Sequence, residues 1–243
     1  MRLYDLTATF SEDLPIYGSD PRVVITEHYA MSRGQSCNVS RLEFGCHTGT
    51  HADVPKHFID DGAACDNIPL DHFLGPAKVF DLRRALDGRL TVEAADLAPL
   101  PIGEGDIILL NTGNSPLMRA RDFHTDYVSL SPEAADLLAD KKIKTIGIDY
   151  LSVEAPGSKG HRTHLALLGA GITILEGLVF DNEPPGFVPQ GQYFLSALPL
   201  KIKNGNGSPV RAVLADERVL ELVIFDMDGL MLDTEPISVA GWH

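Results

Sequence analysis

Two nearly continuous apolar runs constrain the fold of this chain most strongly. The run GDIILLNTG spans residues 105–113, and KTIGIDYL spans residues 144–151. A strand that is hydrophobic along its whole length is buried on both faces, whereas a strand at the surface alternates apolar and polar residues. We therefore expect both runs to be buried strands inside a sheet.

Helices are expected between some of the strands. In SPEAADLLADKK, Ser131 provides the N-cap and Pro132 the first helical position, which is typical of a helix start. A second helix is expected in HRTHLALLGAG, ending at Gly169 or Gly171. Strands mixed with helices predict an α/β domain with a mixed sheet. The further strands are expected at 22–31, 38–53, 77–83, 173–180, 192–203 and 210–215, with NGNGSPV as a tight turn before the last.

Length and charge narrow the possible partners. The 243 residues suffice for one large domain, and no long linker divides residues 1–215. Lys and Arg number 20 against 34 Asp and Glu, and the net charge of −14 argues against nucleic acid or an anionic membrane as partner. No apolar run reaches the roughly 18 residues of a membrane span, and no signal peptide is recognisable.

The cysteines indicate a reducing compartment. Cys37, Cys46 and Cys65 are odd in number and form no CxxC motif. Such a set is typical of reduced thiols rather than of a disulfide framework. We therefore expect a cytoplasmic protein.

The stretch CHTGTHADVPKHF, residues 46–58, carries the densest ligand chemistry. If residues 46–57 are extended, side chains of equal parity share one face. The odd-numbered positions are His47, Gly49, His51, Asp53, Pro55 and His57. On that arrangement every potential ligand points the same way, and Gly49 leaves space for an ion.

The histidines and the aspartate in this stretch are residue types that favour a metal site. Imidazole suits zinc and other first-row metals, and a carboxylate can bridge two ions. A lone strand histidine is more often a satisfied polar residue, but three beside an aspartate favour coordination. A second cluster comprises His161 and His164 at a helix start and Glu176 in an apolar strand. The histidines could face solvent and Glu176 could be salt-bridged, but burying its carboxylate is costly unless it is paired or coordinated.

At these positions the chain resembles the metal-dependent cyclase family, which includes bacterial kynurenine formamidases and isatin hydrolases. HTGTHADVPKHF resembles the family signature HxGTHxDxPxHF. The segments IGIDYLSVE, THLALLGAGITILEGL and LSALPLKI resemble its later motifs. The resemblance covers roughly residues 1–215 and implies a mixed, partly barrel-like sheet flanked by helices, of the swivelling β/β/α type.

The resemblance also implies roles for individual residues. The implied ligands of two divalent ions are His47, His51, Asp53, His164 and Glu176, with Asp53 and Glu176 bridging. His57 falls at the catalytic acid/base position, and His161 has no counterpart role. Tyr17 stands where kynurenine formamidases carry a tryptophan against an aromatic substrate. A homodimer or homotetramer is implied, with the N-terminal segment helping to close the neighbouring site.

These roles predict a metal-dependent hydrolase acting on a C–N amide bond. A metal-activated water would attack the carbonyl, and His57 would carry the proton to the leaving nitrogen. Zinc is the expected metal, with manganese as the alternative because of the oxygen donors. The expected substrate is a small aryl formamide such as N-formylkynurenine. A cyclic-amide hydrolase of the isatin type and a non-catalytic metal-binding protein remain the alternatives.

The last residues differ in character from the rest. LELVIFDMDGLMLDTE resembles the opening of haloacid-dehalogenase-like phosphatases, in which Asp226 would be the nucleophile and Asp228 the general acid. The sequence stops at His243, before the later motifs of such an enzyme. We therefore expect a hydrolase domain over 1–216 and a truncated, non-functional phosphatase-like fragment over 217–243.

Overall fold

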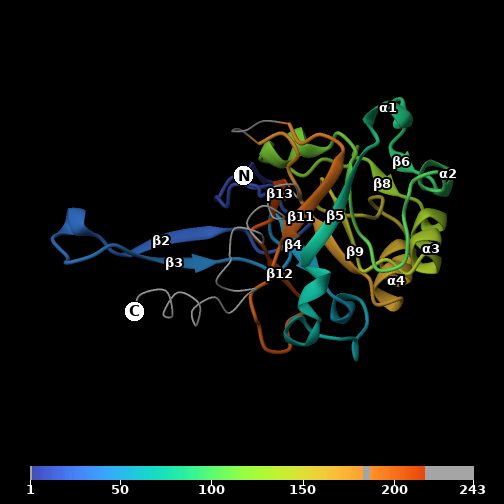
Figure 1. Cartoon of the computed structure of the whole chain (residues 1–243). Helices are drawn as coiled ribbons and strands as arrows, with labels where there is room; N and C mark the ends of the chain where they lie inside the picture. The colour runs from blue at the N-terminus through green and yellow to red at the C-terminus, as the bar shows by residue number, and fades with distance from the viewer. Residues whose placement is uncertain (1, 183–186, 217–243) are drawn as a thin grey trace, which may run out of the picture.

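A nine-stranded sheet forms the body of the protein. The computed structural model describes residues 2–182 and 187–216 (Figure 1). In spatial order the strands are β1 (Leu3–Asp5), β13 (Val213–Asp216), β11 (Gly191–Ser196), β5 (Leu74–Asp81), β7 (Ile107–Asn111), β9 (Thr145–Ile148), β10 (Thr173–Glu176), β4 (His51–Asp53) and β12 (Gly207–Pro209).

The centre of the sheet is parallel and its flanks are antiparallel. Strands β5, β7, β9 and β10 pair in parallel, whereas β11, β13 and β1 on one side and β4 and β12 on the other pair antiparallel. Every residue of β7 and of β9 is buried. The two apolar runs are therefore central strands of a mixed sheet, as expected.

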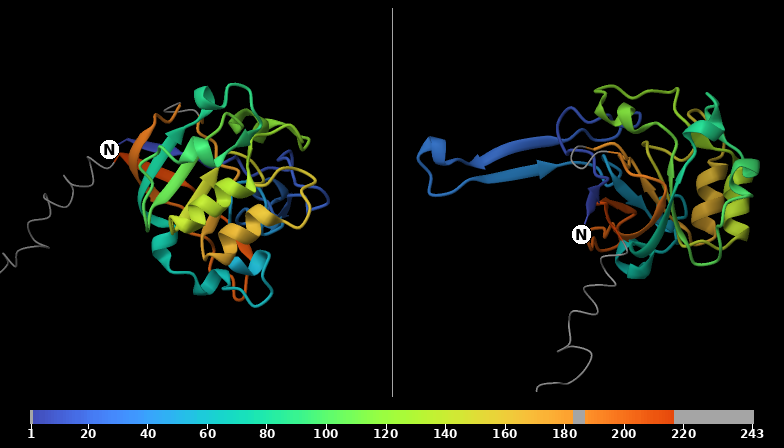
Figure 2. Two further views of the ribbon diagram at one scale, coloured as in Figure 1. Left: turned by 90° about the vertical axis from the view of Figure 1, so that its right-hand side faces the viewer. Right: turned by 45° about the horizontal axis from the view of Figure 1, so that its top comes forward.

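Helices α3 (Pro132–Asp140) and α4 (Arg162–Gly169) cover one face of this sheet (Figure 2). Ile108 of β7 and Ile146 of β9 pack there with Leu138 of α3 and Leu167 of α4, all fully buried. Burying each such side chain stabilises the fold by about 1.5–3 kcal/mol. The predicted start of α3 is confirmed, because the Ser131 hydroxyl accepts a hydrogen bond from the Ala134 amide at 3.1 Å.

The other face curls onto itself. Tyr4 of edge strand β1 and Ala52 of β4 share one buried cluster with Leu109 of β7 and Leu175 of β10. Strands from both sides of the sheet can meet in one core only if the sheet bends around it. The partly barrel-like mixed sheet that the resemblance implied is thus confirmed.

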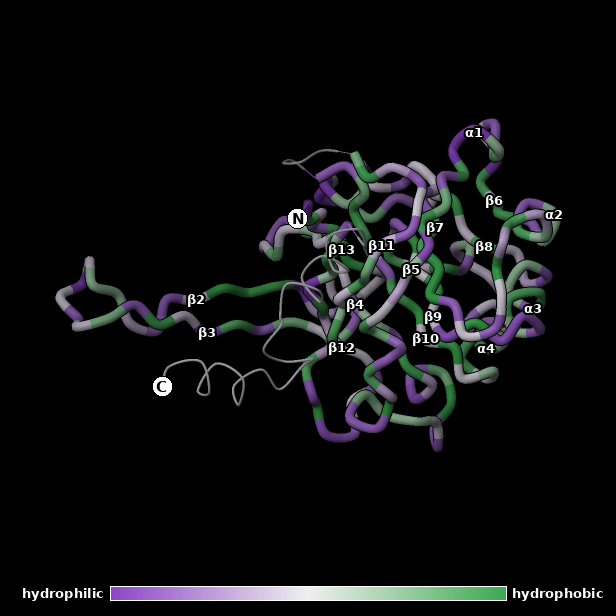
Figure 3. Tube along the Cα trace, in the orientation of Figure 1, coloured by the Kyte–Doolittle hydropathy of each residue, from purple (hydrophilic) through white to green (hydrophobic). Residues whose placement is uncertain are grey.

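A long hairpin projects from this body (Figures 1 and 2). It consists of β2 (Val24–Tyr29) and β3 (Val39–Glu43), joined through the short 3₁₀ helix η1 (Met31–Arg33), and every residue of both strands is exposed. Hydrophobic stretches alternate with hydrophilic ones along it (Figure 3). The strand expected over 38–53 is therefore two strands, because the chain turns between Glu43 and His51.

Smaller elements complete the described part of the chain. NGNGSPV does not only turn, because its last residues pair with β4 as strand β12. No described helix has the length and apolar character to cross a membrane. The phosphatase-like segment, with Asp226 and Asp228, lies outside the described residues. The remaining elements are α1 (Arg83–Leu86), β6 (Thr91–Val92), α2 (Ala94–Leu97), β8 (Ser129–Leu130), η2 (Pro55–His57), η3 (Cys65–Asn67), η4 (Leu70–His72) and η5 (Ser115–Arg119).

Candidate metal centre

The pairing of β4 with β10 places the first ligand candidates. His51 lies directly opposite Glu176 in this antiparallel pair, so both side chains project from the same face. His51 Nε2 lies 3.4 Å from Glu176 Oε2 and 3.4 Å from Asp53 Oδ1. The other ring nitrogen of His51 contacts the Gly49 carbonyl oxygen at 2.9 Å, which fixes the ring with Nε2 toward the carboxylates. All three side chains are almost completely buried.

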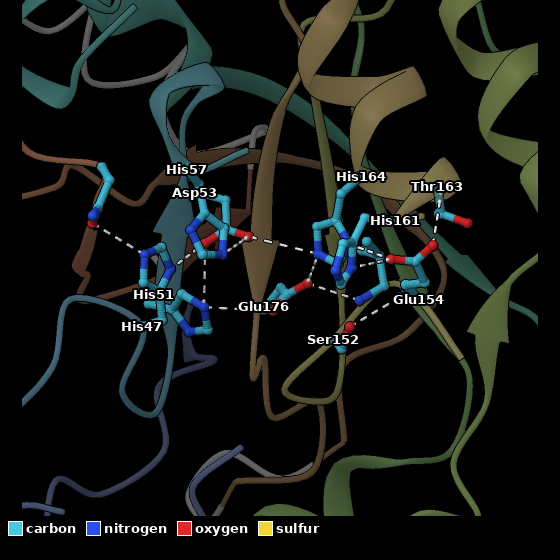
Figure 4. Close-up of polar contacts among 12 residues, drawn as sticks. His47, His51, Asp53, His57, Ser152, Glu154, His161, Thr163, His164 and Glu176 are labelled. Atoms are coloured by element: carbon cyan, nitrogen blue, oxygen red, sulfur yellow. Dashed lines mark hydrogen bonds and ion pairs between the residues drawn. The ribbon is translucent and has the colours of Figure 1, made fainter. Parts of the chain in front are cut away.

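His47 reaches the same carboxylate from a turn. Its Nδ1 lies 2.6 Å from Asp53 Oδ1, and its Nε2 lies 3.2 Å from Asn206 Oδ1 (Figure 4). The expected extended conformation of residues 46–57 therefore holds only for residues 51–54, because residues 46–50 turn and residues 55–57 form the 3₁₀ helix η2. The grouping of the odd-numbered side chains survives because the turn bends His47 back toward the strand.

Gly49 has another role than the one expected from the sequence. Its φ of +63° lies in the left-handed region, and a Cβ there would contact Leu14, 3.1 Å away, rather than the ligand cluster. The Gly49 carbonyl also lies close against Gly177, where a Cβ would come within 2.4 Å of the oxygen. The two glycines let the backbones meet beside the site, which no larger residue would permit.

Helix α4 contributes the remaining ligand candidate. His164 lies in its first turn, with Nε2 3.5 Å from Glu176 Oε1 and 3.9 Å from Asp53 Oδ2. The side chain is buried and its ring stacks on Phe58 at 4.4 Å between centroids. Helix and sheet thus bring together residues that are far apart in the sequence (Figure 4).

Two overlapping groups of potential ligands result. His47, His51 and Asp53 form one group, and Asp53, His164 and Glu176 form the other, with donor atoms within 4.8 Å of one another in each. Asp53 belongs to both. Its Oδ2 atom is buried without a hydrogen-bond partner, and such an orphaned oxygen is costly unless a cation binds it. The residues therefore fit divalent metal.

The pKa values of the buried histidines and carboxylates show that positive charge is favoured in this cluster. Burial lowers the pKa of His51 and of His164, but the hydrogen bonds that these rings donate to the neighbouring carboxylates outweigh burial and raise both pKa values to about 10. Burial alone would raise the pKa of Asp53, whereas His47 and His51 hold it well below the usual range. A divalent cation supplies positive charge beside neutral imidazoles.

His57 lies beside the cluster rather than inside it. It ends the 3₁₀ helix η2, its ring stacks on His47 at 3.7 Å, and its Nε2 lies 4.0 Å from Asp53 Oδ2. Burial lowers its pKa to about 4 despite the nearby Asp53 carboxylate. The ring is therefore neutral at pH 7.

A cavity of about 170 Å³ opens above these residues. Tyr17 lines it and packs edge-on against Phe123 with centroids 4.9 Å apart. Phe58 provides a second aromatic wall. The other lining residues are Asp20, His47, His51, His57, Leu151, Ser152, His161, His164 and Glu176. His161, which had no assigned role, thus borders the cavity.

Sequence reasoning missed Glu154. Its carboxylate is buried and lies 2.9 Å from Nδ1 of His164, ten residues further along the chain. No periodicity links the two residues, because a loop of irregular structure connects them. The only available signal was the position of Glu154 at the end of the motif IGIDYLSVE.

Comparisons with known proteins agree with this arrangement. The chain is 34% identical over 216 residues to a kynurenine formamidase of Erythrobacter litoralis (strain HTCC2594), covering 88% of this chain and 94% of the relative. A kynurenine formamidase of Salinibacter ruber (strain DSM 13855 / M31) is 35% identical over 224 residues, covering 89% and 98%.

Solved structures share the fold. A protein from Bacillus stearothermophilus described as a predicted metal-dependent hydrolase is 36% identical, with a TM-score of 0.74 and coverage of 88% of this chain and 97% of that chain. Isatin hydrolase A from Labrenzia aggregata is 29% identical, with a TM-score of 0.73 and coverage of 88% and 93%. The family model named Cyclase matches residues 4–155. The chain belongs to the Cyclase family of metal-dependent hydrolases.

Proposed function

We propose that this chain is a metal-dependent amidohydrolase that cleaves the C–N amide bond of a small aryl formamide resembling N-formylkynurenine. One observation carries the proposal. Two ligand groups share the buried Asp53 carboxylate, and the neutral His57 ring stands directly beside them. A purely structural metal site closes with four ligands and needs no such spare imidazole. The kynurenine formamidases to which the chain is similar support the substrate class.

The chain's own residues divide the work of hydrolysis. The metal would be held by five side chains, which are His47, His51, Asp53, His164 and Glu176. When bound, divalent ions supply Lewis acidity, which polarises a carbonyl and makes water a better nucleophile near neutral pH. His57 accepts the proton of the attacking water at Nε2 and delivers it to the nitrogen of the broken C–N bond. Water then supplies a hydroxyl to the acyl carbon and a proton to the amine, so the atoms balance.

The cavity supports an aromatic substrate of modest size. Tyr17 and Phe58 offer two ring walls, and a volume of about 170 Å³ lies below the roughly 300 Å³ at which drug-sized pockets begin. Closing the cavity on a planar ring would exclude water from the reacting bond. We assign Tyr17 to substrate binding on this basis.

A cyclic-amide hydrolase is the second candidate. Isatin hydrolase A shares this fold at 29% identity, and a fused aromatic amide would fit between the same two rings. The chemistry at His57 would be the same, except that the nitrogen stays tethered to the product. Substrate preference separates the two candidates.

We further propose two ions per chain, zinc in the first instance and manganese as the rival. The sharing of Asp53 by both ligand groups supports the number. Imidazole donors favour zinc, whereas the carboxylate oxygens also suit manganese. Metal analysis of the purified chain is the direct measurement.

The proposed function is tested by hydrolysis with and without metal. N-formylkynurenine, a simple aryl formamide and isatin are assayed before and after removal of metal with a chelator. We expect hydrolysis of a formamide that is lost on chelation and restored by zinc or manganese. A metal-loaded protein that hydrolyses none of the three would point to a non-catalytic binding protein. A chain that takes up no metal would refute the proposal.

We propose a second copy of the chain as the partner of the projecting hairpin. An isolated two-stranded hairpin is barely stable in water, yet this one exposes 54% of Leu42 and 60% of Met31. Between residues 22 and 43, three arginines stand against two glutamates, a net charge of +1 in a chain of −14. The rest of a second copy is therefore complementary in charge.

Light scattering should give two or four times the chain mass of 26.4 kDa. We expect Leu42→Glu, on the exposed hairpin, to shift that value toward the single-chain mass. A monomeric parent chain would contradict the proposal.

We also propose a cytoplasmic location, which the free thiols of Cys37, Cys46 and Cys65 support.

A further inference from the structure

The motif IGIDYLSVE has no role in the chemistry described so far, although its end lies against the ligand cluster. We infer that Glu154 is a positioning residue, whose carboxylate fixes the His164 ring so that Nε2 faces the metal-binding carboxylates. The inference rests on the proposed metal centre and goes beyond it, because Glu154 belongs to neither of the two ligand groups.

The contact with His164 determines which ring nitrogen is free. Glu154 Oε2 lies 2.9 Å from Nδ1 of His164. An ionised carboxylate only accepts hydrogen bonds, so Nδ1 must carry the proton. Nε2, which points to Glu176 Oε1 at 3.5 Å, is then the nitrogen that can bind metal. A carboxylate on the far nitrogen of a metal-bound imidazole fixes ring orientation and raises its basicity.

Glu154 is itself held in place from several directions. The Thr163 amide donates to Oε1 at 3.2 Å, and the Ser152 hydroxyl accepts from the Glu154 amide at 3.1 Å. The Tyr127 hydroxyl donates to the Glu154 carbonyl oxygen at 2.5 Å. With 5% of the residue exposed, the carboxylate has no freedom to seek other partners in water. Its position is therefore rigid enough to orient a ring.

The residue before Glu154 supports the other downstream ligand. The Val153 amide donates to Glu176 Oε1 at 2.7 Å. Consecutive residues thus brace both His164 and Glu176, the two ligands that come from outside the first motif. The end of IGIDYLSVE thus contacts both side chains through hydrogen bonds and not only through apolar packing.

A purely structural role for Glu154 would have different consequences from a positioning role. Because Glu154 accepts from the Thr163 amide in the first turn of α4, it could simply cap that helix. It also lies 3.4 Å from Nδ1 of His161, whose side chain is 58% exposed. Capping would affect folding, whereas positioning affects the metal. The readout must therefore report on the His164 ring.

The experiment compares Glu154→Gln, Glu154→Ala and His161→Ala with the parent chain, all loaded with zinc. Zinc affinity is measured by competition with a chromophoric chelator. We expect Glu154→Ala to bind zinc about 10–100-fold more weakly. Glu154→Gln, which keeps the shape and one acceptor oxygen, should lose less. His161→Ala removes the other imidazole on the same oxygen and should keep parental affinity.

Long-range ¹H–¹⁵N spectra of the histidine rings give the specific readout. In the parent chain we expect His164 to carry its proton on Nδ1, and in Glu154→Ala to lose that single tautomer. Parental affinity and tautomer in both Glu154 variants would overturn the inference while leaving the proposed function intact. An equal loss of affinity in His161→Ala would also overturn it. If Glu154→Ala does not fold, Glu154→Gln alone decides. A parent chain without zinc would refute both.

Discussion

Replacing His57 by alanine is expected to lower kcat by about 10²–10⁴-fold, the usual contribution of a positioned acid/base. The reason is geometric. His57 belongs to neither ligand group, but its Nε2 lies 4.0 Å from Asp53 Oδ2 at the border of the cavity. Removing the ring therefore spares both groups of candidate ligands and takes away the proposed proton carrier.

Metal content and steady-state kinetics measured together check this expectation. The metal-to-protein ratio should match that of the parent chain, and the loss should fall on kcat more than on KM. His72→Ala is the matched control, since His72 lies in η4 beside Thr173 and outside the cavity. Full turnover of a metal-loaded His57→Ala chain would show that another group moves the proton.

Replacing Asp53 by asparagine is expected to have the larger effect on the metal. Asp53 is the one member common to both ligand groups, and its Oδ2 atom is without a hydrogen-bond partner. Asparagine keeps the shape but removes the negative charge and turns one oxygen into a donor. We expect both metal positions to be weakened at once and hydrolysis to fall to the level of the chelated parent protein.

Elemental analysis after gel filtration gives the measurement. Asp71→Asn serves as the control, because Asp71 is an exposed acid paired with Lys144 at 2.8 Å and should contribute at most about 1 kcal/mol. Its metal content should equal that of the parent. An Asp53→Asn chain that still holds two ions would show that Asp53 does not bridge them.

The fold was predictable where burial dictates the sequence. The runs around Ile107–Asn111 and Thr145–Ile148 are apolar because both faces of those strands are covered, and they were recognised for that reason. The break between Glu43 and His51 was not predicted. It depends on the positive φ of Gly49 and on its close approach to Gly177, a contact between distant residues that no local pattern records.

The sequence indicated which residues come together at the candidate site, but not which structural elements bring them there. Asp53 and Glu176 do lie together with the three histidines, yet only His51 and Asp53 share a strand, so the face argument was correct for two residues alone. His47 joins them from a turn. Glu154 was missed because its partner His164 lies across a loop, and no spacing rule connects a buried acid to a ring ten residues away.

The register of β4 against β10 links the metal centre to the integrity of the core. His51 stands opposite Glu176, while the next pair, Ala52 and Leu175, points to the opposite face and is fully buried there. A slip by one residue would exchange the two faces, driving ligands into an apolar core and aliphatic side chains into the site. Only the native register of these two strands therefore places His51 and Glu176 on the same face. If the proposed metal site forms from these residues, metal binding also reports that β4 and β10 are in the correct register.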